Sequence, residues 1–116
     1  TNTPLQALAA LNDEQLVEAA RVLAEKALQE SSGNDAACLR QVCRLVLSRA
    51  PSNRELEILT NSLTELRDWY SAHESDAAAL IAVGETQPSA AIPAAELAAW
   101  TMLCNQLLNL DEVLNK

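Results

Sequence analysis

The sequence contains no phenylalanine, and aromatic residues make up only 3% of its 116 positions, although 49% are apolar. An apolar share of this size argues against disorder, and the length fits one domain with a modest core. A core of Ala, Leu and Val suits close helix–helix packing. Glycine occurs twice and proline four times, so the chain has few places to break. We therefore predict a single all-α domain over residues 1–116, a compact bundle of about five to six helices with orthogonal or irregular up-down packing.

Basic residues are also scarce: eight stand against sixteen acidic ones, and the net charge is −8. A nucleic-acid binder needs a basic face to neutralise phosphates, and an anionic membrane surface makes a similar demand. No apolar run approaches the roughly 20 residues of a membrane span. We expect neither a nucleic-acid partner nor membrane insertion, and the oligomeric state stays open. The sequence lacks an initiator Met and a signal peptide, which we interpret as a piece of a larger protein.

Histidine and cysteine are too few for a metal or haem site. His73 is the single histidine, at a predicted helix end, where an exposed or C-capping side chain is usual. Cys38, Cys43 and Cys104 form neither CxxC nor CxxCH, so a structural zinc site has almost no support. Two glycines cannot build a phosphate-binding loop. We predict no catalytic, cofactor-binding or metal-binding residue, and we interpret the thiols as small, free core residues.

Helix-start signals and apolar stripes predict the helices. Thr3-Pro4-Leu5-Gln6 is a capping pattern that opens a short first helix. Asp35 is expected to cap the third helix, and Ser52 and Glu55 form a capping box for the fourth. The later helices are expected over about residues 13–30, 35–49, 77–83 (with Gly84 as C-cap) and 93–109, while the fourth opens at residue 53 and carries its stripe to Tyr70. Residues 110–116 are expected to continue the last helix as a frayed turn.

The stripes indicate which faces are buried. In the second helix Glu18, Arg21 and Glu25 lie mostly opposite the apolar stripe, with the spacing of surface ion pairs worth a few tenths of a kcal/mol. The fourth helix has the cleanest stripe, which is either core-facing or a partner-binding zipper. Trp69 and Tyr70 are either core and helix-end packing or a stacking platform. The stripe of the fourth helix is Leu56, Leu59, Leu63, Leu66 and Tyr70, and the inner face of the last helix is Leu97, Trp100, Thr101, Cys104, Leu107 and Leu108.

A few polar residues have no role in capping or in a stripe. General acid–base catalysis needs two carboxylates that converge on a cleft with separated pKa values, and the sequence shows no such convergence. Glu85, Asn109, Asp111 and Glu112 remain as candidates for an interdomain or functional surface.

Several motifs together resemble a known family. The N-terminal run from Thr1 to Leu8 is followed by Leu11-Asn12-Asp13 and by Val17-Glu18-Ala19-Ala20-Arg21. Further along come an L-x-R-x-P-x-x-x-E stretch from Leu47 to Glu55, Val83-Gly84-Glu85, and two segments of a closing helix, 95–101 and 107–112. In this order they resemble the C-terminal part of a planctomycete-type domain of unknown function, number 1553.

The resemblance implies a setting rather than an activity. Such domains close large exported bacterial proteins that also carry a cytochrome-c-like haem domain and a companion domain of unknown function, number 1549. It implies a periplasmic or otherwise exported location, with any haem c elsewhere in the parent protein. An oxidising compartment would permit a Cys43–Cys104 or Cys38–Cys104 disulfide.

Two functions follow as hypotheses. The first is a structural or protein-interaction module that packs against other domains of its parent and has no catalysis of its own. The alternative is one wall of the active site of an exported enzyme, acting on polysaccharide, with Glu85, Asp111 and Glu112 as the candidate residues.

Overall fold

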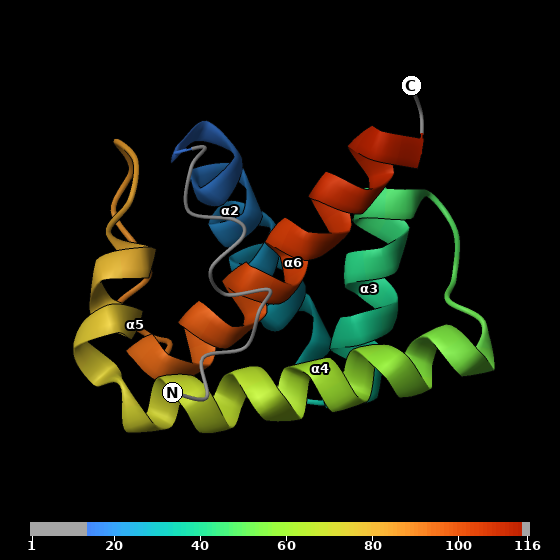
Figure 1. The fold of residues 1–116 in the computed structure, drawn as a ribbon, viewed down its shortest axis with the longest axis horizontal. Helices are drawn as coiled ribbons and strands as arrows, with labels where there is room; N and C mark the ends of the chain where they lie inside the picture. Colours follow the sequence, from blue (N-terminus) through green and yellow to red (C-terminus); the bar gives the residue numbers. More distant parts are fainter. Residues whose placement is uncertain (1–13, 115–116) are drawn as a thin grey trace.

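One helix is surrounded by four others. The computed structural model describes residues 14–114, with side chains up to residue 109, and places in them α2 (Glu14–Ser31), α3 (Asp35–Leu47), α4 (Asn53–Ala72), α5 (Glu74–Ile81) and α6 (Ala94–Leu114). α6 contacts each of the other four helices. It runs diagonally through the molecule, while α4 crosses beneath α3 and α6 (Figure 1). The prediction of an all-α bundle with irregular packing is confirmed, with no strand in the described part.

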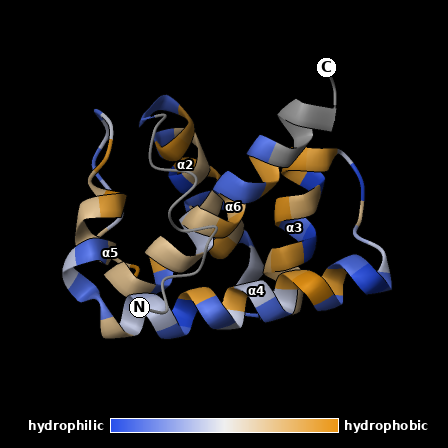
Figure 2. Cartoon of the chain, viewed as in Figure 1, coloured by the Kyte–Doolittle hydropathy of each residue, from blue (hydrophilic) through white to orange (hydrophobic). Residues whose placement is uncertain are grey.

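The burial of α6 differs from the prediction of one inner face. Nine consecutive residues, 97–105, are fully buried, so the whole circumference of the helix is covered there. A helix that is apolar on all sides is a helix inside a core, and the neighbouring helices supply the cover. In Figure 2 apolar colours dominate the first half of α6, whereas polar and apolar residues alternate along α4.

The stripes of α2 and α4 face the core as predicted, and both helices pack against α6. Val17, Ala20, Ala24 and Ala27 of α2 are buried, and small side chains let α2 approach α6 closely. In α4 Leu63, Leu66 and Tyr70 are buried, while Leu56 and Leu59, nearer its start, are only partly buried. The stripe therefore serves the core along the second part of α4 and reaches the surface along the first part.

The helix ends confirm some signals and correct others. The capping box of α4 is present: the Glu55 backbone N–H donates to Ser52 Oγ at 3.1 Å, and Ser52 N–H donates to Glu55 Oε1 at 2.8 Å. The expected Asp35 cap is wrong, because Asn34 Oδ1 accepts the Ala37 N–H at 2.9 Å and Asp35 is the first residue of α3.

The predicted bounds of α5 and the predicted end of α3 are also wrong. α5 begins at Glu74, whose charge favours the helix N-terminus, and it ends at Ile81 with Ala82 as C-cap instead of Gly84. α3 stops at Leu47, where Ser48 adopts a left-handed φ of 61°. α6 continues as a helix to Leu114, where a frayed turn was expected from residue 110 onward. The expected helix at Thr3–Gln6 lies outside the described residues.

Candidate functional site

The turn between α3 and α4, residues 48–52, is held by one carboxylate. Arg49 donates two hydrogen bonds to Glu55, at 2.7 and 2.8 Å, while the same carboxylate accepts the Ser52 backbone N–H. The hydrogen bonds from Arg49, with that from Ser52, lower the pKa of Glu55 to about 2, because they favour its charged form. The L-x-R-x-P-x-x-x-E stretch is thus a helix–turn–helix joint closed by its Arg and its Glu.

This joint borders an apolar cleft of about 220 Å³. Ile58 is 50% exposed; the only other exposed large apolar side chain in the described part is Val22 on α2, at 48%. Leucines from three helices meet at the cleft, and Glu55 is the one carboxylate among its lining residues. The lining residues are Cys43 and Leu47 of α3, Arg49 of the turn, Glu55, Ile58 and Leu59 of α4, and Leu107 of α6.

The three thiols are free and buried in this structure. Desolvation raises the pKa of Cys38 to about 11 and also raises the pKa values of Cys43 and Cys104, because burial disfavours the thiolate. Cys43 lies against the cleft as a protonated core residue. The thiols therefore lack the low pKa and exposure that reactive cysteines need.

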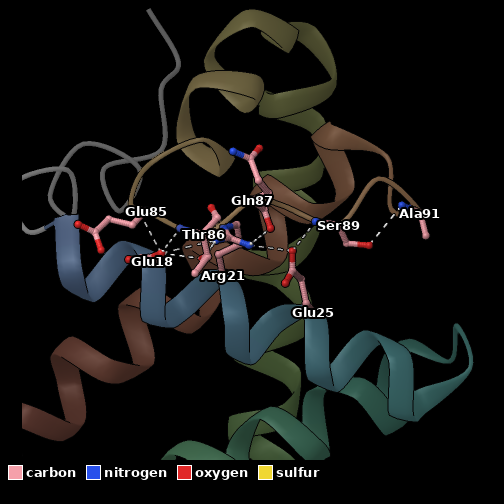
Figure 3. Close-up of polar contacts among 8 residues, drawn as sticks. All are labelled: Glu18, Arg21, Glu25, Glu85, Thr86, Gln87, Ser89 and Ala91. Atoms are coloured by element: carbon pink, nitrogen blue, oxygen red, sulfur yellow. Dashed lines mark hydrogen bonds and ion pairs between the residues drawn. The ribbon is translucent and has the colours of Figure 1, made fainter.

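A second polar cluster joins α2 to the loop between α5 and α6. Arg21 is only 1% exposed, which overturns the prediction of an outward-facing side chain. Its guanidinium donates to the carbonyls of Thr86 at 3.0 Å and Gln87 at 3.3 Å, to the Thr86 hydroxyl, and to Glu25 at 2.9 Å. Figure 3 shows the loop lying over α2 at this point. The loop covers the polar face of α2, and this cover is why Arg21 is buried.

The two glutamates beside Arg21 bind the backbone of the same loop. Glu18 Oε2 accepts the N–H groups of Glu85 at 3.0 Å and Thr86 at 2.7 Å, and the Thr86 hydroxyl at 2.6 Å (Figure 3). Glu25 Oε2 accepts the Ser89 N–H at 2.7 Å. The hydrogen bonds from Thr86 hold the pKa of Glu18 below its usual value. These carboxylates position the connector, each through its Oε2 oxygen.

A third cluster ties α3, α4 and α6 together. Arg67 donates to Asp35 at 2.7 and 2.8 Å and to Glu96 at 2.9 and 2.5 Å. The buried Trp100 donates its indole N–H to Glu96 at 3.0 Å. The hydrogen bonds from Arg67 hold the pKa of Asp35 below its usual value. One guanidinium with two carboxylates on different helices fixes helix packing rather than a reaction centre.

Two of the four predicted surface residues, Glu85 and Asn109, have described side chains, and these two lie apart. Glu85 is exposed on the loop, and Asn109 is half-buried in α6, where it donates to Asn105 at 3.0 Å. Figure 1 places that loop and the end of α6 on opposite sides of the molecule. Asp111 and Glu112 lie outside the residues whose side chains are described. The cleft and the Arg21 cluster were missed because both depend on contacts between segments far apart in the sequence.

Trp69, Tyr70 and His73 lie together at the end of α4. Tyr70 is buried, in agreement with core packing, and meets the partly exposed Trp69 edge to face. His73 is exposed at the C-cap of α4, as predicted, where it stacks on Trp69 and its Nδ1 lies 2.7 Å from the Trp69 carbonyl oxygen. These three rings close the end of α4.

Two features are absent from the described residues. None of their helices is both long and apolar enough to span a membrane. Within the same range, His, Cys, Asp and Glu side chains form no group of three or more that could hold a metal ion.

Fold and site together define an all-helical domain with an apolar cleft beside a helix–turn–helix joint. The family model of PSD1, described as a protein of unknown function (DUF1553), matches residues 1–63. The match covers more than half of the chain, and the chain belongs to this family. It includes every lining residue of the cleft except Leu107. No curated protein matches the chain, and no solved structure matches it.

Proposed function

We propose that this domain is a protein-interaction module, which docks through its cleft against another part of the larger protein to which it belongs. The observation that carries the proposal is the cleft itself, in which Leu47, Leu59 and Leu107 meet beneath a half-exposed Ile58. Covering apolar surface of this kind is favourable by about 25 cal/mol per Å². A partner that inserts apolar side chains gains this energy without any rearrangement of the core.

The chemistry of the cleft favours docking over catalysis. Its one carboxylate, Glu55, is bound by Arg49 and Ser52, and its thiol is buried with a raised pKa. General acid–base catalysis needs groups whose pKa lies near the working pH, whereas Glu55 is held in its charged form and Cys43 in its protonated form. The volume of about 220 Å³ is also below the roughly 300–1,000 Å³ of small-molecule sites.

The family resemblance bears on the location of the larger protein and on the domains that could be its partners. We place the larger protein outside the cytoplasm, as the family resemblance implies, with a companion domain and a haem domain as the potential partners. Asn109, which is half-buried two residues after the cleft residue Leu107 on α6, would border the docking surface. Recovery of the tagged natural protein from the cytoplasmic fraction would contradict the exported location.

A peptide array tests the docking function directly. The labelled 116-residue chain is applied to overlapping peptides that tile the rest of the natural protein. We expect binding to a small set of peptides with spaced apolar residues. Ile58→Asp should abolish it, because a carboxylate at the mouth opposes apolar insertion. Val22→Asp is the matched control, since Val22 is equally exposed but lies on α2. If no peptide binds, or if Ile58→Asp binds like the wild type, the proposal is wrong.

A further inference from the structure

The surface around the cleft has a charge opposite to that of the chain. Residues 36–54 contain four arginines and no acidic residue, within a chain whose net charge is −8. All four, namely Arg40, Arg44, Arg49 and Arg54, are exposed. Arg49 is paired with Glu55, whereas the other three make no ion pair with any described residue. Half of the basic residues of the protein thus lie in one segment, and most of their charge is available to a partner.

Helix geometry places these charges beside the apolar lining. Residues three or four apart share one face of a helix. Arg40 therefore neighbours Cys43, and Arg44 neighbours Leu47, both of which line the cleft from α3. Arg54 is one turn before Ile58 on α4, and Arg49 itself lines the cleft. The cleft is an apolar depression with guanidinium groups along its α3 and α4 borders.

We infer that the occupant of the cleft is an acidic amphipathic helix, one whose apolar stripe is flanked by Asp and Glu. This inference rests on the proposed docking function and names its partner class. A groove between helices receives the apolar anchors of an amphipathic helix at positions i, i+3 or i+4, and i+7. The small cleft volume fits a few inserted side chains, with the helix lying on the surface. Its acidic flanks then face the arginines, and complementary charge gives the pairing its specificity.

A nucleic acid is the other polymer that four arginines attract. Its phosphates would not bind the apolar lining of the cleft, and the negative net charge of the chain would repel the nucleic acid. The patch therefore fits a partner that combines apolar anchors with carboxylates.

Fluorescence anisotropy with designed peptides tests the inference. The probe is a synthetic helix of about 18 residues, long enough to fold in water, with leucines in one stripe and glutamates on both flanks. This probe is the Leu/Glu peptide. Two comparison peptides carry lysine in place of glutamate (the Leu/Lys peptide) or serine in place of leucine (the Ser/Glu peptide). We expect the Leu/Glu peptide to bind about tenfold more tightly than the Leu/Lys peptide, the effect of a few exposed ion pairs. Its affinity should fall as salt is raised.

Variants of the chain test whether the arginines cause the preference for the Leu/Glu peptide. Arg44→Glu and Arg54→Glu should each weaken the Leu/Glu peptide and strengthen the Leu/Lys peptide. Lys26→Glu is the matched control, because it makes the same charge change on the exposed surface of α2 and should leave both unchanged. Equal binding of the Leu/Glu and Leu/Lys peptides, both lost in Ile58→Asp, would overturn the inference and leave the docking function standing.

Three other outcomes would also contradict the inference. If Ile58→Asp binds the Leu/Glu peptide as tightly as the wild type does, the proposed function fails together with the inference. Binding of the Ser/Glu peptide as tight as that of the Leu/Glu peptide would show a purely ionic site and contradict the apolar anchor. A labelled single-stranded oligonucleotide that competes with the Leu/Glu peptide would assign the arginines to a nucleic acid instead. Circular dichroism of each variant verifies that it is folded.

Discussion

Replacing Arg21 by Met should destabilise the domain severely. The Arg21 side chain is 1% exposed and supports the loop 84–91 through hydrogen bonds to the Thr86 and Gln87 carbonyls and an ion pair with Glu25. Methionine retains much of the apolar stem but leaves these groups without their donor. Breaking a buried ion pair in this way costs about 3–5 kcal/mol.

The lower end of this range fits the details of the site. Arg21 Nε has no hydrogen-bond partner among the described residues, so its removal offsets part of the loss. Glu25 also keeps the Ser89 N–H as a donor. We therefore expect a loss of about 3 kcal/mol in the free energy of unfolding, which lowers Tm by about 12 °C for a domain of this size.

Urea denaturation followed by circular dichroism measures this change, with Lys26→Met as the control. Lys26 is exposed on the same helix, and its replacement should change stability by less than about 0.5 kcal/mol. Hydrogen exchange should also become faster across residues 84–91 in Arg21→Met. If Arg21→Met costs no more than Lys26→Met, Arg21 does not hold the loop and the reasoning is refuted.

Three further predictions follow from the same geometry. Gly84→Ala should cost about 2 kcal/mol in urea denaturation, because Gly84 has a φ of +101° and a Cβ there would collide with the Glu18 side chain; unchanged stability would contradict the close approach. The folded-state pKa of Glu55, about 2, lies below its usual 4.5, so its contribution to stability is complete above about pH 4.5 and is lost as pH falls toward 2. Carboxyl NMR should place its midpoint near 2, and a midpoint near 4.5 would contradict the pairing with Arg49. The three thiols should resist iodoacetamide in the native chain and react in urea, whereas rapid native alkylation of Cys43 would mean that the cleft floor opens.

Features set by neighbours in the sequence were predictable. The capping box of Ser52 and Glu55 is complete within four residues, and the α4 stripe from Leu63 to Tyr70 follows the helical period, so both were found. Asn34 displaced Asp35 as the cap of α3 because either residue type can cap and the choice depends on local backbone geometry. Such errors shift a boundary by one residue and leave the helix in place.

Features set by distant segments were not predictable. Arg21 is polar and stands on the polar side of a helical wheel, yet a loop 65 residues away covers it. The full burial of residues 97–105 likewise depends on the four surrounding helices. The cleft forms because Leu107 lies beside α3 and α4, and no residue spacing in the sequence indicates that contact. The family match points to the right segment without indicating that it borders a cleft.

The central claim is that this cleft receives apolar side chains of a partner. Methyl NMR of the 116-residue chain, titrated with the Leu/Glu peptide and with any peptide selected from the array, tests it most directly. We predict shifts of the methyl signals of Leu47, Ile58, Leu59 and Leu107, while the signals of Val22, which is as exposed as Ile58, stay unchanged. Shifts centred on Val22, or no shift of the four cleft methyls at saturating peptide, would contradict it.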